Sequence, residues 1–65
     1  MTNQQFMSEM GRLENILFAF ALRLTRNYED AQDLVQETTF RAYKHRDKFA
    51  IGTNFKSWSS TIMRN

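Results

Sequence analysis

The stretch LENILFAFALRLTRNYEDAQDLVQETTFRA, residues 13–42, decides the fold because two helical patterns meet within it at a single break. Before the break, apolar residues recur at alternating steps of four and three, which is typical of one face of an amphipathic helix. That face consists of Phe6, Met10, Leu13, Leu17, Ala21 and Leu24, and it is widened by Ile16 and Phe20. The pattern stops after Thr25 and Arg26, so a first helix is predicted to end there.

A second helix is predicted to begin directly after this break. Asn27 is a favourable N-cap, and Glu29 and Asp30 lie in the first turn, where the positive end of the helix dipole stabilises acidic side chains. Apolar and small residues then recur at helical spacing, so this helix also has one inner face. The inner face consists of Ala31, Leu34, Val35, Thr38 and Ala42.

The start of the first helix is left open by the sequence. Thr2 can form a capping box with Gln5, and Ser8 is an alternative cap several residues later. Gly11 slightly favours the later start, because a glycine inside a helix costs about 1 kcal/mol relative to alanine.

A third, short helix is predicted after a loop at residues 47–53, where Gly52 is the strongest turn former. Thr53 or Asn54 caps this helix, which is expected to run to Asn65. The chain reaches its last residue without a stop signal, so we expect an all-α fold, a compact three-helix domain over residues 1–65 with the third helix truncated at its C-terminal end. The expected core consists of Leu13, Ile16, Leu17, Phe20, Leu24, Leu34, Val35, Ala42, Trp58 and Ile62.

Composition places the chain among small soluble proteins. Hydrophobic residues make up 42% and charged residues 25% of the sequence, which is ordinary for a globular chain. No apolar run approaches the roughly 20 residues needed to cross a bilayer, and no secretory signal pattern follows Met1. We therefore expect a cytoplasmic protein with no membrane insertion. The absence of cysteine excludes disulfide bonds and thiolate metal sites.

Charge is distributed unevenly along the chain. Residues 1–40 hold three basic and six acidic side chains, a net charge of −3, whereas residues 41–65 hold six basic side chains and Asp47, a net charge of +5. An acidic part followed by a basic part suggests two different partners, because a field of one sign attracts only complementary surfaces. Chance asymmetry of a solvated surface is the alternative.

No catalytic constellation is visible in the sequence. His45 is the single histidine, there is no cysteine, and neither glycine belongs to a phosphate-binding loop. The carboxylates at positions 29, 30, 33 and 37 raise a metal site as an alternative, but no Glu-x-x-His pair accompanies them. We therefore expect no enzyme, no cofactor and no metal.

Five segments follow one another along the chain: EDAQDLVQET at 29–38, FRAY at 40–43, DKF at 47–49, GTNFKSW at 52–58 and TIMRN at 61–65. In this order they resemble the second homology region of the bacterial sigma factors, particularly the extracytoplasmic-function branch. The resemblance spans residues 12–65 and implies a small helical domain of a transcription initiation factor. It also implies that the helix matching residues 28–45 binds the clamp helices of the beta-prime subunit of core RNA polymerase.

Carried over by position, the polymerase contacts implied by this resemblance are Asp33, Gln36, Glu37, Phe40 and Tyr43. The spacing agrees for the first three, which share a helix face away from the inner one. Carboxylates on that face can accept charge-assisted hydrogen bonds from arginines of a partner helix.

The resemblance further implies that the loop matching residues 49–54 and the helix matching residues 55–65 engage the non-template strand of the minus-ten promoter element. A flipped base would lie in the loop. The DNA-binding candidates are Lys48, Phe49, Thr53, Asn54, Lys56, Arg64 and Asn65. The cationic members suit phosphates and Phe49 suits stacking on an unpaired base, whereas Phe55 and Trp58 are interpreted as packing residues.

The chain departs from the family pattern after Trp58, where Ser59 and Ser60 replace a large apolar residue and a frequent aromatic one. The alternative hypothesis is a helical protein-interaction module that binds polymerase or a regulator without reading DNA. An anti-sigma factor is a further possible partner. Self-association into a homo-oligomer is also expected, because Phe40, Phe55 and Ile62 are predicted to be incompletely covered.

Overall fold

The computed structural model describes residues 1–50 and 52–65, and helices dominate this part of the chain. The elements are α1 (Asn3–Thr25), α2 (Tyr28–Lys44), the 3₁₀ turn η1 (Arg46–Lys48) and α3 (Phe55–Arg64). The prediction of an all-α fold with three helices is confirmed. Ile51, which belongs to the predicted loop, lies outside the described residues.

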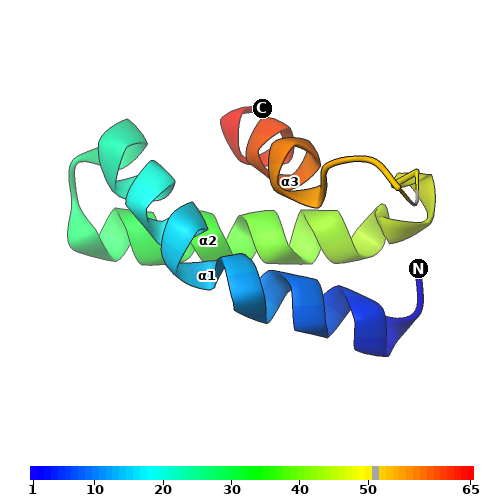
Figure 1. Cartoon of the computed structure of the whole chain (residues 1–65). Coiled ribbons are helices and arrows are strands. Elements are labelled where there is room, and N and C mark those ends of the chain that lie inside the picture. Colours follow the sequence, from blue (N-terminus) through cyan, green and yellow to red (C-terminus); the bar gives the residue numbers. More distant parts are fainter. Residues whose placement is uncertain (51) are drawn as a thin grey trace.

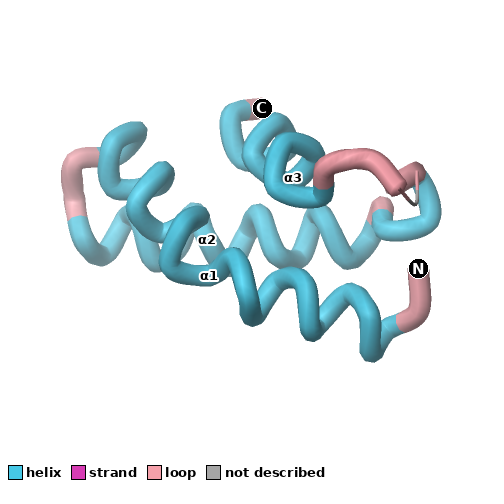
Figure 2. The backbone as a smooth tube through the Cα atoms, in the orientation of Figure 1, coloured by secondary structure: helices cyan, strands magenta, loops and turns pink. Residues whose placement is uncertain are grey.

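The helices α1 and α2 run in opposite directions, and α3 lies across them (Figure 1). The link between α1 and α2 and the longer loop before α3 lie at opposite ends of the molecule (Figure 2). The N-terminus lies near the end of α2 that leads into this longer loop (Figure 1). The first turns of α1 are therefore placed beside the loop before α3.

Local capping explains where the helices begin. The hydroxyl of Thr2 accepts a hydrogen bond from the Gln5 backbone N–H at 3.1 Å, and the Gln5 side-chain oxygen accepts one from the Thr2 N–H at 2.9 Å. This capping box extends α1 to the earlier of its two expected starts. The side chains of Asn27 and Asn54 cap α2 and α3, so Asn54 and not Thr53 is the cap of the third helix.

Between α1 and α2 the chain reverses through Arg26, which has a left-handed conformation with φ of 55°. Its backbone N–H donates to the Leu22 carbonyl at 2.7 Å. This is the usual C-terminal cap of a helix, although glycine more often occupies the position.

The buried residues lie on the predicted inner faces of α1 and α2, with differences at the edges. In α3 the buried face is turned away from the predicted one, because Ser59 and Met63 are buried there whereas Trp58 and Ile62 are half-buried. Ile16 is 42% exposed and Leu24 is 50% exposed, so the prediction that both are core residues is wrong. Ile16 lies at the edge of the buried face of α1, and Leu24 lies in its last turn, where fewer neighbours cover it. The buried apolar residues are Phe6, Met10, Leu13, Leu17, Ala21, Ala31, Ala42, Phe49, Phe55 and Met63, and five of the predicted core residues, Phe20, Leu34, Val35, Trp58 and Ile62, pack against them half-buried.

An aromatic cluster joins α1, α3 and the loop before α3. The ring of Phe55 lies edge-on to Phe6 at a centroid distance of 6.0 Å and edge-on to Phe49 at 5.2 Å. Trp58 lies 5.3 Å from Phe49 and 5.5 Å from Phe55. Because of these contacts Phe55 is only 5% exposed, so the expectation that it is incompletely covered is wrong.

Small polar residues occupy part of the interior. Thr38 and Ser59 are fully buried and Ser60 is nearly so. The Ser59 hydroxyl donates to the carbonyls of Phe55 and Lys56 at 2.9 and 3.1 Å. Within the described residues, the hydroxyls of Thr38 and Ser60 have no hydrogen-bond partner. The two serines that depart from the family pattern thus lie against the core and not on the surface.

Candidate functional site

The outward face of α2 is the first candidate surface. Asp33, Gln36, Glu37 and Phe40 are all exposed, and the Phe40 ring is 66% exposed. They lie opposite the buried residues of the same helix, because side chains three, four and seven residues apart share one helix face. The structure therefore brings together four of the five side chains that the resemblance assigned to polymerase binding.

Tyr43, the fifth of these, lies at the edge of this face. Its ring contacts Phe6 edge-on at 5.5 Å, and the guanidinium carbon of Arg46 lies 3.9 Å from the ring centroid. Arg46 also donates to the Tyr43 carbonyl at 2.7 Å. Tyr43 thus connects the α2 surface with α1 and η1.

The acidic side chains of α2 form no ion pair with the residues that the structure describes. Across residues 1–50 and 52–65, the single ion pair joins Arg12 to Glu9 on α1. The exposed carboxylates of Glu29, Asp33 and Glu37 are consequently free to meet cationic groups of a partner. In the same described part of the chain, no group of three or more histidine, cysteine, aspartate or glutamate side chains is arranged to hold a metal ion.

Hydrogen bonds hold Thr53 and Asn54 in place directly before α3. The N–H and the hydroxyl of Thr53 both donate to the Ala50 carbonyl, at 3.1 and 2.6 Å. Gly52 has a φ of 98°, a backbone conformation that residues with a side chain rarely adopt. The side-chain oxygen of Asn54 then caps α3 by accepting a hydrogen bond from the Ser57 N–H. Thr53 and Asn54 are held in place by these bonds and remain exposed.

Phe49 does not present its ring to solvent. It is 8% exposed and packs against Phe55 and Trp58, so the structure gives it a packing position. From the sequence, Phe55 and Trp58 are predicted to pack in the interior, whereas Phe49 is predicted to stack on a DNA base. In this structure all three rings belong to the same cluster, because the loop folds back over the start of α3.

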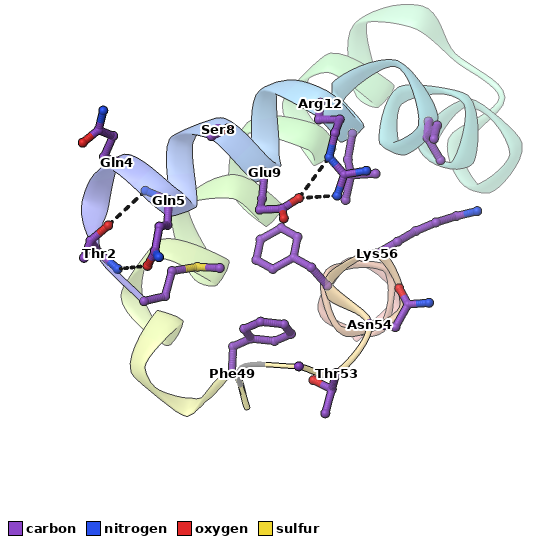
Figure 3. A pocket seen from close by; sticks show the side chains of 15 residues that line it. Thr2, Gln4, Gln5, Ser8, Glu9, Arg12, Phe49, Thr53, Asn54 and Lys56 are labelled. Atoms are coloured by element: carbon purple, nitrogen blue, oxygen red, sulfur yellow. Dashed lines mark hydrogen bonds and ion pairs between the residues drawn. The ribbon is translucent and has the colours of Figure 1, made fainter.

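An open cleft of about 1030 Å³ lies between the first turns of α1 and the start of α3 (Figure 3). Thr53, Asn54 and Lys56 line one side of it, and Lys56 extends away from Phe49 along the outside of the cleft. The structure thus brings together four of the seven DNA candidates at this cleft, because the largely buried Phe49 also lines it beside the exposed Thr53, Asn54 and Lys56. Lys48 on η1 and the terminal pair Arg64 and Asn65 are exposed but do not line this cleft.

The other wall of the cleft was not recognised from the sequence. It is formed by α1, with Gln5 and the ion pair of Glu9 and Arg12 (Figure 3). A second groove of about 400 Å³ continues along α1 and is lined by Asn15, Ile16, Ala19, Phe20, Arg23 and Lys56. The sequence feature that could have indicated this wall is the eleven-residue spacing of Arg12 and Arg23. This spacing places both side chains on one side of the helix, beside its apolar face.

None of the described helices is both long and apolar enough to cross a membrane.

Comparison with known proteins identifies a family that this chain matches. Residues 10–65 match sigma-70 region 2. The chain is 49% identical to the ECF RNA polymerase sigma factor EcfG of Rhodopseudomonas palustris over 49 residues, which cover 75% of this chain and 27% of that relative.

Two further relatives come from Mycobacterium tuberculosis. The ECF RNA polymerase sigma factor SigG is 41% identical over 49 residues, 75% of this chain and 13% of the relative. The ECF RNA polymerase sigma factor SigL is 40% identical over 53 residues, 77% of this chain and 29% of the relative. The matching segment therefore spans less than a third of the length of each of these relatives.

Proposed function

Because this chain belongs to the sigma-70 family, in its extracytoplasmic-function branch and through region 2, we propose that it is a non-enzymatic transcription initiation factor segment. It docks on core RNA polymerase in the cytoplasm through the outward face of α2. It contacts the non-template strand of promoter DNA through the loop before α3 and through α3 itself. The observation that carries the proposal is the exposed acidic face of α2, whose carboxylates form no ion pair with any described residue.

The α2 face has the chemistry of a protein-docking surface. Phe40 supplies an exposed ring at the C-terminal end of the face, and Asp33, Gln36 and Glu37 place hydrogen-bond acceptors on its N-terminal side. Exposed aromatic residues next to polar groups are typical anchors of protein interfaces. The partner surface that fits carries arginine or lysine, and we assign it to the clamp helices of the beta-prime subunit.

The DNA face is supported by charge and by exposure. Lys48, Lys56 and Arg64 carry exposed cationic groups, and they belong to residues 41–65, which have a net charge of +5. Thr53 and Asn54 supply polar groups that the loop hydrogen bonds hold in place. Phosphate contacts position a strand, whereas polar contacts with base edges distinguish one base from another.

A pull-down on core RNA polymerase tests the docking face. Replacing Asp33, Gln36 and Glu37 together by alanine is expected to weaken binding strongly, because each lost charge-assisted hydrogen bond is worth about 1.5–3 kcal/mol. Glu14→Ala, an exposed carboxylate change on α1, is the matched control and should leave binding intact. Unchanged affinity of the triple variant, with an unchanged melting curve, would remove α2 from the interface.

A second function, a polymerase-binding module that does not read DNA, is favoured by one observation. Phe49 is buried, so most of the ring that was predicted to stack on a base is covered by protein. Crosslinking of promoter DNA to the polymerase complex through a cysteine placed at Thr53 separates the two functions. DNA capture at this position supports DNA reading, and capture of protein alone supports the interaction module.

A further inference from the structure

The outward face of α2 carries both signs of charge, separated by an apolar ring. Glu37 lies about one turn before Phe40 and Lys44 lies about one turn after it, and all three side chains are exposed. Asp33 extends the acidic end by one further turn and is also exposed. Because residues three, four and seven positions apart share a helix face, these four side chains form one stripe, which we call the α2 stripe. Its order along the helix is acidic, apolar, basic.

The groups of the α2 stripe are not satisfied within the chain. Glu37 and Lys44 are seven residues apart, which corresponds to about 10 Å along the helix axis and is too far for an ion pair. Neither side chain pairs with any other residue that the structure describes. The Phe40 ring is 66% exposed. Met7 and Tyr28 are nearly as exposed, but the residues one turn before and after each of them are uncharged.

The α2 stripe is complementary to itself when it is turned end to end. Consider two copies of α2 packed antiparallel, with the twofold axis passing between positions 40 and 41. Positions 37 and 44 lie equally far from that axis, so Glu37 of each copy faces Lys44 of the other, and the two Phe40 rings meet beside the axis. Parallel packing would set Glu37 against Glu37 and Lys44 against Lys44, which is unfavourable. The charge pattern therefore selects the antiparallel orientation.

We propose that this protein pairs with a second copy through antiparallel contact of the two α2 stripes, and that the paired form does not bind core RNA polymerase. The second part rests on the proposed function, since Asp33, Glu37 and Phe40 are also assigned to polymerase docking. A contact between two single helices is small, so the pair exchanges readily. Self-pairing covers the Phe40 ring in the free protein, and polymerase has to displace the second copy before it docks.

Sedimentation equilibrium at low salt tests the pairing with charge reversals. Glu37→Lys or Lys44→Glu creates two like-charge contacts in each pair, because symmetry makes every substitution act twice, and should raise the dissociation constant by roughly tenfold or more. A mixture of the two variants should pair, although neither pairs with itself, because one chain then carries lysine at both positions and the other glutamate. Glu14→Lys and Lys56→Glu are matched controls, since they make the same charge changes at exposed positions outside α2 and should pair like the wild type.

Three results of this experiment would overturn the inference. They are a wild-type chain that stays monomeric at every concentration, single reversals that pair as well as the wild type, and a mixture of the two reversals that stays monomeric. Recovery of pairing in the mixture supports the inference and also shows that both variants are folded.

Energy transfer tests whether polymerase and the second copy compete. The chain has no cysteine, so Met7→Cys, an exposed position on α1 outside the stripe, can carry a donor dye in one sample and an acceptor dye in another. Transfer in the mixed sample should fall as core RNA polymerase is added. Polymerase that binds the labelled chain without loss of transfer would overturn the exclusion. Polymerase that does not bind at all would instead overturn the proposed function, whereas the charge reversals decide the pairing without polymerase.

Discussion

The buried hydroxyl of Thr38 allows a direct test of how an unpartnered polar group affects the stability of this fold. Thr38 is fully buried in α2, and within the described residues its hydroxyl has no hydrogen-bond partner. Its neighbour Thr39 is half-buried, and the hydroxyl of Thr39 donates to the Val35 carbonyl at 2.9 Å. The same substitution at these adjacent positions should therefore have different effects.

Thr38→Val replaces the unpartnered hydroxyl by a methyl group of similar size. Threonine and valine have nearly equal helix propensities, so the helix itself should contribute little to the change. Burial of an unsatisfied polar group costs about 1–3 kcal/mol, and Thr38→Val is expected to raise the free energy of unfolding by about that amount. For a domain of this size each kcal/mol corresponds to roughly 4–8 °C in melting temperature.

Thr39→Val is the matched control. It removes a hydrogen bond that is made, which contributes about 0.5–1.5 kcal/mol, so the free energy of unfolding should stay the same or fall by up to that amount. Urea denaturation followed by circular dichroism measures the free energy of unfolding of both variants. An unchanged slope of this free energy against urea concentration shows that unfolding exposes the same amount of surface. The reasoning is refuted if Thr38→Val is no more stable than Thr39→Val, because the buried hydroxyl would then have a partner in solution.

Three further predictions concern a cap, a core ring and an exposed ring. Asn27→Ala should lower the free energy of unfolding by about 1 kcal/mol in the same urea assay, because the Asp30 N–H loses its side-chain acceptor, and Asn27→Asp should restore it. Phe49→Ala should abolish the cooperative melt of the isolated chain, since loss of a buried phenylalanine costs about 3–5 kcal/mol and a core of this size supplies little more. Phe49→Leu should keep the fold, and a change in base preference of the polymerase complex with this variant would show that the ring contacts DNA. Phe40→Ser should shift the isolated chain toward monomer in sedimentation equilibrium, because the exposed ring is the apolar surface we expect to drive self-association, and a concentration-independent monomer before substitution would contradict that expectation.

Exposed apolar residues on several faces explain why self-association is expected. Met7, Tyr28 and Phe40 are each more than half exposed. A 65-residue chain has little interior in which to hide them, and contact with a second copy or with polymerase covers them.

The helices of this protein were predictable because their signals are local. The four-and-three spacing of α1, the break at Arg26 and the cap at Asn27 depend on residues within one or two turns of each other. The outward face of α2 followed from the same periodicity, since the burial of Thr38 and Ala42 on one side leaves Asp33 and Phe40 on the other.

The edges of each helix were not predictable, because their environment is set by a neighbouring element. Ile16 follows the apolar period but lies beside the groove that α3 leaves open, whereas Phe49 lies in a loop and is covered by Phe55 and Trp58. Hydrophobic periodicity indicates which residues share a helix face, but it does not indicate how much of that face a neighbouring helix covers.

The sequence by itself therefore determined that this chain forms three helices with one acidic outward face and one basic terminal part, because propensity, capping and charge are properties of nearby residues. Only the tertiary structure decided that α3 lies across the α1–α2 pair, that Phe49 enters the aromatic cluster and that Arg12, Lys56 and Arg23 line one groove. These arrangements join residues as far as 49 positions apart, such as Phe6 and Phe55, and they depend on which surfaces remain uncovered once the helices have packed. Packing selects among docking geometries that local preferences leave equally open.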